Sequence, residues 1–204
     1  MRLKIGKTRV TVGFAFVAVV CALLTADESG VCAVSLASSV FHECGHLLCM
    51  LCLGYPPEKV ELFVCGMRIS ESNQSRCVRH EIAVALSGPA MNFAAGLFLF
   101  LLYLQNAADI RFAAVNFLIG AFNMLPCVPL DAGRILSAVL SRFYEEEKTQ
   151  LIMLRISAVL AASVFAVGIL VFIHCNGNFS LLAVGGYLTV SALVNKKRLP
   201  NIGF

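Results

Sequence analysis

The sequence has little charge. Only 14% of its 204 residues are charged and 59% are hydrophobic, which gives a mean hydropathy of +0.84. A water-soluble domain carries about a quarter charged residues, so this chain has too few polar groups for a water-exposed surface. The composition also argues against a disordered chain and against a nucleic-acid-binding protein, and we expect no nucleic acid partner. The length fits one domain, which we expect to span residues 1–204.

A disulfide framework is missing as well. The nine cysteines are an odd number, and most of them lie inside apolar runs. In such runs a free cysteine behaves as a small hydrophobic residue. No internal repeat or low-complexity stretch is evident. These absences together indicate a protein that is embedded in the lipid bilayer.

Apolar segments near the length of a membrane span fill most of the chain. About 20 residues, at a rise of about 1.5 Å each, cross the hydrocarbon layer. Pro126 and Pro129 break the fourth segment, and broken backbone at membrane depth occurs where protein or a water-filled cavity satisfies it, so the break indicates a functional site. The sequence predicts an all-α polytopic membrane protein with about six transmembrane helices: residues 10–26, 31–53, 82–104, 112–125 with a continuation at 131–140, 156–173 and 179–194.

The basic residues predict the orientation. With both termini in the cytoplasm, every Lys and Arg except Arg111 lies on the inner side. This positive-inside pattern supports an even number of spans. The basic run before residues 10–26 also resembles a signal peptide, and an uncleaved first span explains it equally well.

A metal-binding pattern lies in the second segment, in the run Phe41-His42-Glu43-Cys44-Gly45-His46. His42 and His46 are four residues apart, so they share one helix face and suit two ligands of a tetrahedral zinc ion. Glu43 is placed to accept a proton from a water that zinc activates. Each ionisable residue at mid-bilayer costs about 2.5 kcal/mol or more, which favours function over a buried polar cluster without metal.

Two histidines leave zinc short of a third protein ligand, and Asp131 is the candidate. Alone, Asp131 would be interpreted as a helix N-cap after the prolines. Beside two histidines it completes a hydrolytic set of two imidazoles, one carboxylate and a water around one Zn²⁺ per chain. Cys49 and Cys52 also follow the histidines, but apolar packing explains them better than metal binding.

Two asparagines lie in apolar surroundings. Asn92 ends the run Ser87-Gly88-Pro89-Ala90-Met91-Asn92, whose small residues allow close helix approach. For Asn92 we expect an interhelical hydrogen bond ahead of a direct catalytic role. Asn123 adjoins the proline break, where an amide is able to bind substrate backbone or stabilise an oxyanion.

The long loop 54–81 contains an alternating pattern. Val60, Leu62 and Val64 alternate with Glu61, Phe63 and Cys65 before Gly66, and a second alternating run follows. The pattern predicts a small β-hairpin at the cytoplasmic interface, and an irregular loop remains the alternative. A free hairpin edge would be able to add a substrate strand.

Three motifs in this order carry a family resemblance: His42-Glu43-x-Gly45-His46, Gly88-Pro89-x-x-Asn92 and Asn123-x-x-Pro126-x-x-Pro129-Leu130-Asp131-x-Gly133-Arg134. Together they resemble the site-2 protease family of intramembrane zinc metalloproteases, most closely its sporulation-type bacterial branch.

The resemblance implies that His42, His46 and Asp131 bind zinc and that Glu43 is the catalytic base. It also implies cleavage of a membrane-bound protein substrate in or near a transmembrane segment, often to release a transcription regulator. We therefore expect the protein to lie in a bacterial cell membrane, with its active site toward the cytoplasm. The resemblance also allows for a regulatory partner in the membrane.

The sequence departs from the family pattern in two places. Ala132 replaces the first glycine of the usual Asp-Gly-Gly, which is acceptable where the backbone is helical and strained where φ is positive. The chain ends shortly after residues 196–200, so we expect neither the nucleotide-sensing domain nor the PDZ domain of some members, and no regulation through them.

Two other functions compete with proteolysis. Some zinc transporters also carry HExxH-like runs, but only four histidines exist here and the outer halves of the spans lack acidic residues. This asymmetry favours an enzyme that is open to one side. A scaffold without catalysis is disfavoured by the complete set of His42, Glu43, His46 and Asp131. Replacement of Glu43 with Gln separates the three functions.

Overall fold

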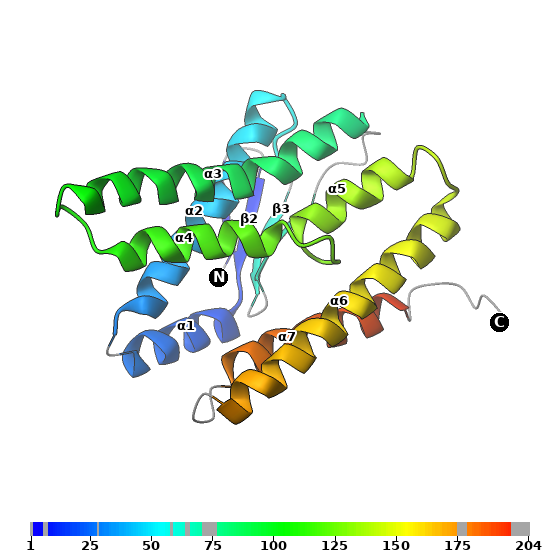
Figure 1. Cartoon of the computed structure of the whole chain (residues 1–204). Coiled ribbons are helices and arrows are strands. Elements are labelled where there is room, and N and C mark those ends of the chain that lie inside the picture. Colours follow the sequence, from blue (N-terminus) through cyan, green and yellow to red (C-terminus); the bar gives the residue numbers. More distant parts are fainter. Residues whose placement is uncertain are drawn as a thin grey trace. The chain divides into compact units, whose positions relative to one another are not determined.

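The computed structural model describes residues 2–5, 8–27, 29–57, 59–63, 66–70, 77–174 and 179–196. Within these residues the chain folds into helices α1–α7 and strands β1–β4 (Figure 1). They form two compact units, residues 1–122 and 123–204. Each unit is described separately, and the single domain expected from length stays a prediction.

Four helices follow one another along the first unit: α1 (Phe14–Ala26), α2 (Val31–Cys52), α3 (Val78–Leu104) and α4 (Ile110–Asn123). Helices α2 and α3 pack closely at Gly45, where an added Cβ would lie 2.7 Å from the Ser87 carbonyl oxygen. Helices α3 and α4 also meet at a glycine, because an added Cβ at Gly96 would lie 3.2 Å from the Phe117 ring. Small residues at these contacts allow the backbones to approach.

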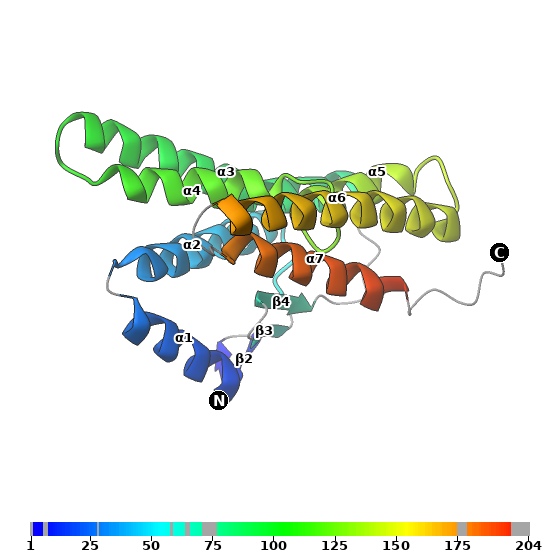
Figure 2. The same ribbon diagram turned by 60° about the horizontal axis from the view of Figure 1, so that its bottom comes forward.

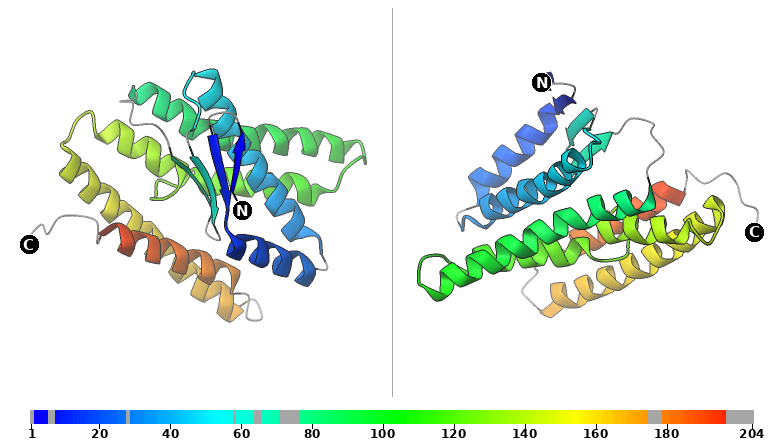
Figure 3. Two further views of the ribbon diagram at one scale, coloured as in Figure 1. Left: turned by 180° about the vertical axis from the view of Figure 1, so that it is seen from behind. Right: turned by 90° about the horizontal axis from the view of Figure 1, so that it is seen from above.

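A four-stranded sheet belongs to the same unit (Figure 3). Its strands are β1 (Arg2–Ile5), β2 (Thr8–Val12), β3 (Lys59–Phe63) and β4 (Gly66–Ser70), in the order β1-β2-β3-β4. Strands β3 and β4 pair antiparallel, whereas β2 and β3 pair parallel. Because β3 has a neighbour on both sides, the open edges among the described strands are those of β1 and β4. The place of the hairpin at the membrane surface stays a prediction.

The expected start of the first span was wrong. Residues 10–12, which we assigned to the span 10–26, belong to β2, and α1 begins at Phe14. The β-branched residues Thr8, Val10 and Val12 recur every second position, a pattern that suits a strand. The pairing of β2 with β3, about fifty positions later, lies beyond the reach of a local pattern.

Among the described residues, three helices are long and apolar enough to cross a membrane, judged by length and composition: α2, α3 and α6 (Glu146–His174). Helix α4 and residues Leu181–Val194 are apolar but shorter. The chain thus has the helices of a membrane protein, and the count of six spans stays a prediction.

The second unit contains α5 (Asp131–Leu140), α6 and α7 (Ser180–Lys196). Helices α6 and α7 lie side by side (Figure 2). Added Cβ atoms at Gly168 and Gly185 would lie 2.9 Å from Leu182 N and 2.8 Å from Phe165 Cα. This pair therefore packs backbone against backbone.

Several polar side chains are buried, whereas many large apolar side chains are exposed. The Leu118, Val159 and Phe98 side chains are 69%, 67% and 61% exposed. Apolar exteriors of this extent suit a lipid environment rather than water. The predicted zinc ligands His42, His46 and Asp131 are among the buried polar residues. The others are Ser38, Asn92, Asn116, Thr149 and Ser157.

Candidate metal centre

Helix α2 presents His42 and His46 toward α3. The two side chains are 5% and 3% exposed. Their rings lie edge to face with centroids 4.8 Å apart. Gly45 lets α3 come close on this side of α2. The i, i+4 spacing has therefore placed both imidazoles on one buried face, as expected.

Hydrogen bonds determine which ring nitrogens carry the protons. His46 Nδ1 lies 2.7 Å from the Val84 carbonyl oxygen, which only accepts, so Nδ1 donates. His42 Nδ1 lies 3.1 Å from Asn92 Oδ1, while Asn92 Nδ2 donates to the Ser38 carbonyl at 3.5 Å. With the amide oriented in this way, His42 Nδ1 also donates. In the neutral rings, both Nε2 atoms then hold a lone pair.

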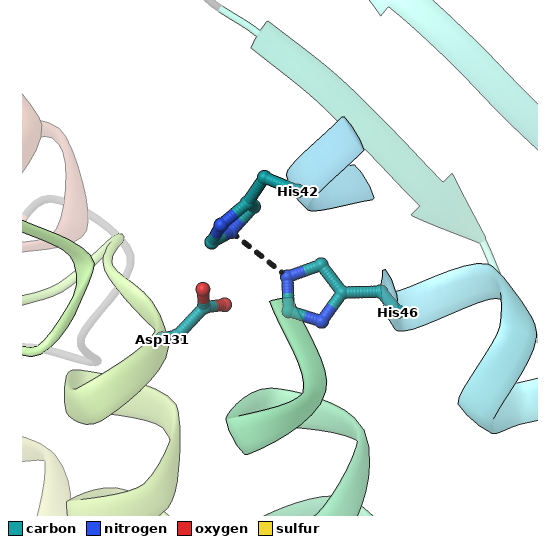
Figure 4. A group of neighbouring side chains, drawn as sticks. All are labelled: His42, His46 and Asp131. Atoms are coloured by element: carbon teal, nitrogen blue, oxygen red, sulfur yellow. Dashed lines mark hydrogen bonds between the residues drawn. The ribbon is translucent and has the colours of Figure 1, made fainter. Parts of the chain in front are cut away.

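The two Nε2 atoms face each other at 3.1 Å, the contact drawn as a dashed line in Figure 4. Two lone pairs at this separation favour a cation that accepts from both. Zn–N bonds of about 2.0–2.1 Å in tetrahedral geometry place two nitrogens about 3.3 Å apart. The observed spacing is close to this value, so the pair fits one metal ion.

Gly88 of α3 keeps the space beside these nitrogens open. An added Cβ at Gly88 would lie 2.5 Å from His46 Nε2 and 2.7 Å from His42 Nε2. Any side chain at this position would enter the volume in which a metal ion binds. The lack of a Cβ at Gly88 is thus a second, independent feature that fits a metal.

Asp131 is the first residue of α5 and is 6% exposed. The N-cap position belongs to Leu130, without a side-chain capping bond, so Asp131 does not act as the N-cap. Its Oδ1 lies 3.8 Å from Arg134 Nη1. A carboxylate in the first turn is also stabilised by the helix dipole.

Each of the three buried residues offers one ligand atom, and these atoms all lie within 4.8 Å of one another (Figure 4). Two imidazole nitrogens and a carboxylate oxygen are the donor set of hydrolytic zinc sites. No cysteine belongs to this group.

The other predicted residues lie as follows. Glu43 follows His42 on α2 and is half-buried, and Asn123 is the last residue of α4. Asn92 is fully buried, with its amide shared between His42 and Ser38. Ala132 is the second residue of α5, where its backbone is helical and the methyl group carries no strain.

Two contributors escaped the sequence reasoning. Val84 acts through its backbone carbonyl, which leaves no signal in the residue type. Gly88 lies in a run of small residues that predicted close helix packing. The run did not indicate that this glycine faces the His42 and His46 rings.

Comparison with known proteins points in one direction. A model of Peptidase family M50 matches residues 110–164, which include the Asn123–Arg134 motif. A zinc metalloprotease of Methanocaldococcus jannaschii is 29% identical over 143 residues, covering 65% of this chain and 41% of that protein. A protein of Mycobacterium tuberculosis named putative zinc metalloprotease Rip3 is 28% identical over 177 residues. The match covers 80% of this chain and 45% of that protein.

A solved structure shares the fold of this chain. The site-2 protease from Methanocaldococcus jannaschii matches with a TM-score of 0.71 and 25% identity, covering 100% of this chain and 98% of that one. In its sequence motifs and in its fold, the chain resembles the site-2 protease family. These matches confirm the family resemblance that the three motifs carry. The chain spans less than half the length of the curated relatives that it matches.

Proposed function

We propose that this chain is an intramembrane zinc metalloprotease that hydrolyses a peptide bond in or near a transmembrane segment of a membrane-bound protein. The observation that carries the proposal is the opposed pair of Nε2 atoms, 3.1 Å apart, whose Nδ1 atoms both donate elsewhere. The names of the relatives and the family resemblance support the same activity.

In this proposal His42, His46 and Asp131 hold one zinc ion. When bound, zinc acts as a Lewis acid toward the scissile carbonyl and makes hydroxide available near neutral pH. Glu43, beside His42 on α2, accepts the proton of the attacking water. Its carboxyl group then passes that proton to the nitrogen of the leaving amine.

We assign to Asn92 an interhelical hydrogen bond rather than a direct contact with the substrate or the oxyanion. Its Oδ1 accepts from His42 Nδ1 and its Nδ2 donates to Ser38, so the amide orients a ligand. Outer partners of this kind fix the ring of a metal-binding histidine. Asn123 lies beside the helix break, and we assign its amide to binding the substrate backbone or stabilising the oxyanion.

The substrate has to unwind at the cleaved bond, because the hydrogen bonds of a helix shield its carbonyl groups. The open edge of β4 offers backbone groups to an extended segment. Release of a transcription regulator would follow from such a cut, and a membrane regulatory partner would control it.

We place the chain in a bacterial cell membrane, with both termini and the active site toward the cytoplasm. Arg111 Nη1 donates to the Ser29 carbonyl at 3.2 Å, which joins the α1–α2 loop to the first turn of α4. This contact supports a place on one side of the membrane for the α1–α2 loop and the start of α4. Arg111 also pairs with Asp109 at 2.7 Å, so this outer basic residue is neutralised.

The test compares wild type with Glu43→Gln in host cells, by mass spectrometry of newly formed protein N-termini. We expect a small set of termini in or beside transmembrane segments, lost in the variant. The zinc content of both purified proteins is measured in parallel and should be equal. Identical termini in wild type and variant, with both proteins zinc-loaded, would contradict the proposal, and metal flux would then favour transport.

A further inference from the structure

The strongest unassigned feature is the way in which the segment before Asp131 is attached to α6. Residues 124–130 are not helical and contain two prolines, which have no N–H. The remaining N–H groups must find partners, because no water is available in the hydrocarbon layer. Cys127 N donates to Leu125 at 2.7 Å, and Leu130 N donates to Cys127 at 2.7 Å.

The Val128 N–H has no partner in its own segment. It donates to Ser157 Oγ on α6 at 3.0 Å. The Cys127 thiol also approaches the Ser157 carbonyl, with the sulfur 4.0 Å from the oxygen. The Ser157 and Cys127 side chains are both 0% exposed. Ser157 of α6 thus contacts two consecutive residues of the broken segment, Cys127 and Val128, in a site closed to water.

The same segment is tightly joined to the first turn of α5. An added Cβ at Gly133 would lie 2.4 Å from the Cys127 carbonyl oxygen, so this turn rests directly on Cys127. Arg134 N donates to the Leu130 carbonyl at 3.1 Å. Between these contacts, Asp131 has little freedom to shift along or around the helix axis.

We propose that Ser157 is a positioning residue that fixes the Asp131 carboxylate for metal binding, acting through Val128 and Cys127. The inference rests on the proposed function, because it assigns Asp131 to the metal. Its chemistry is that of an outer partner: Ser157 touches neither metal nor substrate, but holds the loop whose end presents a ligand.

The test uses three variants of the full chain in detergent. Ser157→Ala removes the hydroxyl group, and Ser157→Thr keeps it. Ser163→Ala is the matched control, because Ser163 is an exposed serine of the same helix that bonds only its own helix, at the Val159 carbonyl 2.9 Å away. Zinc affinity is measured by competition with a chelator, independently of any cleavage.

We expect Ser157→Ala to weaken zinc binding by about 10–100-fold, while Ser157→Thr and Ser163→Ala stay near wild type. With the site saturated by Co²⁺, the visible absorption of Ser157→Ala should differ from wild type, because the carboxylate ligand has moved. Where cleavage is measurable, kcat should fall with KM unchanged.

Wild-type zinc affinity and an unaltered Co²⁺ spectrum in folded Ser157→Ala would overturn the inference, as would an equal loss in Ser157→Thr. Should Ser157→Ala fail to fold, Gly133→Ala tests the same chain of contacts from the other side. It should weaken zinc binding, and wild-type affinity there would overturn the inference. Loss of affinity in a chain whose wild type cleaves no substrate would contradict only the proposed function.

Discussion

The helix pairs α2–α3 and α6–α7 achieve close packing in the same way and put it to different uses. In both, glycines bring one helix against the backbone of the other: Gly45 against Ser87 in the first pair and Gly185 against Phe165 in the second. The α2–α3 contact buries two imidazoles and an amide, whereas the buried residues of α7 are Gly185, Leu188 and Ala192.

The difference shows that close packing by itself does not make a site. At Gly185 there is no room for a side chain, because backbone atoms of Phe165 fill the space. At Gly88 a side chain would instead enter the space beside the two Nε2 atoms that hold lone pairs. In lipid, a buried polar group without a partner is costly, so the imidazoles of α2 need both their Nδ1 acceptors and a cation. The α6–α7 contact has no such requirement.

The largest effect should come from Gly88→Ala. Its methyl group would lie 2.5 Å from His46 Nε2, inside the space for the metal. We expect bound zinc to be lost and cleavage to fall by at least about 100-fold, the upper range for disturbing a metal site. Metal analysis and a cleavage assay measure both. The control is Gly96→Ala on the same helix, where the atoms nearest to the methyl group are those of the Phe117 ring, and its zinc content should be unchanged.

The next effect concerns the orientation of His42. Asn92→Leu removes the acceptor of the His42 Nδ1 proton, which should lower zinc affinity by about 10–100-fold. Asn92→Asp keeps an oxygen in the same place and should bind zinc near the wild-type level. Chelator competition measures the affinities. Equal affinity for wild type and the leucine variant would show that Asn92 has no part in the site.

The α6–α7 contact should respond in stability and not in metal binding. In Gly185→Ala the methyl group would lie 2.8 Å from Phe165 Cα, and such overpacking costs about 1–3 kcal/mol. The neighbouring Gly186→Ala is the matched control, since an added Cβ there meets nothing within 4 Å. Thermal unfolding followed by circular dichroism compares the two. A drop in zinc per folded chain in either variant would contradict the comparison.

The smallest effect is electrostatic and lies at the start of α2. Hydrogen bonds from the Ser29 hydroxyl, and then from the Cys32 N–H, lower the pKa of the Asp27 carboxyl below its ordinary 3.8. A lowered pKa means that the stabilisation is present above pH 3.8 and is lost as the pH falls through the folded-state value. Wild type should therefore unfold at a higher temperature than Asp27→Ala at pH 6, with the difference shrinking below pH 3.8. A constant difference across this range would contradict the assignment.

Local patterns were enough to predict some of these features. The i, i+4 spacing placed His42 and His46 on one buried face, and the prolines indicated the break before Asp131. The comparisons confirmed the family resemblance that the three motifs together carried.

Contacts between distant positions were out of reach. His42 and Asn92 are fifty positions apart, and the role of Gly88 depends on what α3 faces rather than on its own sequence. Strand β2 likewise looked like the start of a span, because its parallel partner β3 is not a sequence neighbour. Ser157 was missed because a serine in an apolar helix usually bonds its own backbone.

The central claim is that two imidazoles of α2 and the carboxylate of Asp131 bind one zinc ion. X-ray absorption at the zinc edge of the purified chain tests it most directly, with Asp131→Ala as the comparison. We predict one zinc per chain with two imidazole nitrogens and oxygen ligands at about 2.0–2.2 Å, and a changed oxygen shell in the variant. Sulfur ligands at about 2.3 Å, or a spectrum unaffected by loss of Asp131, would contradict the account.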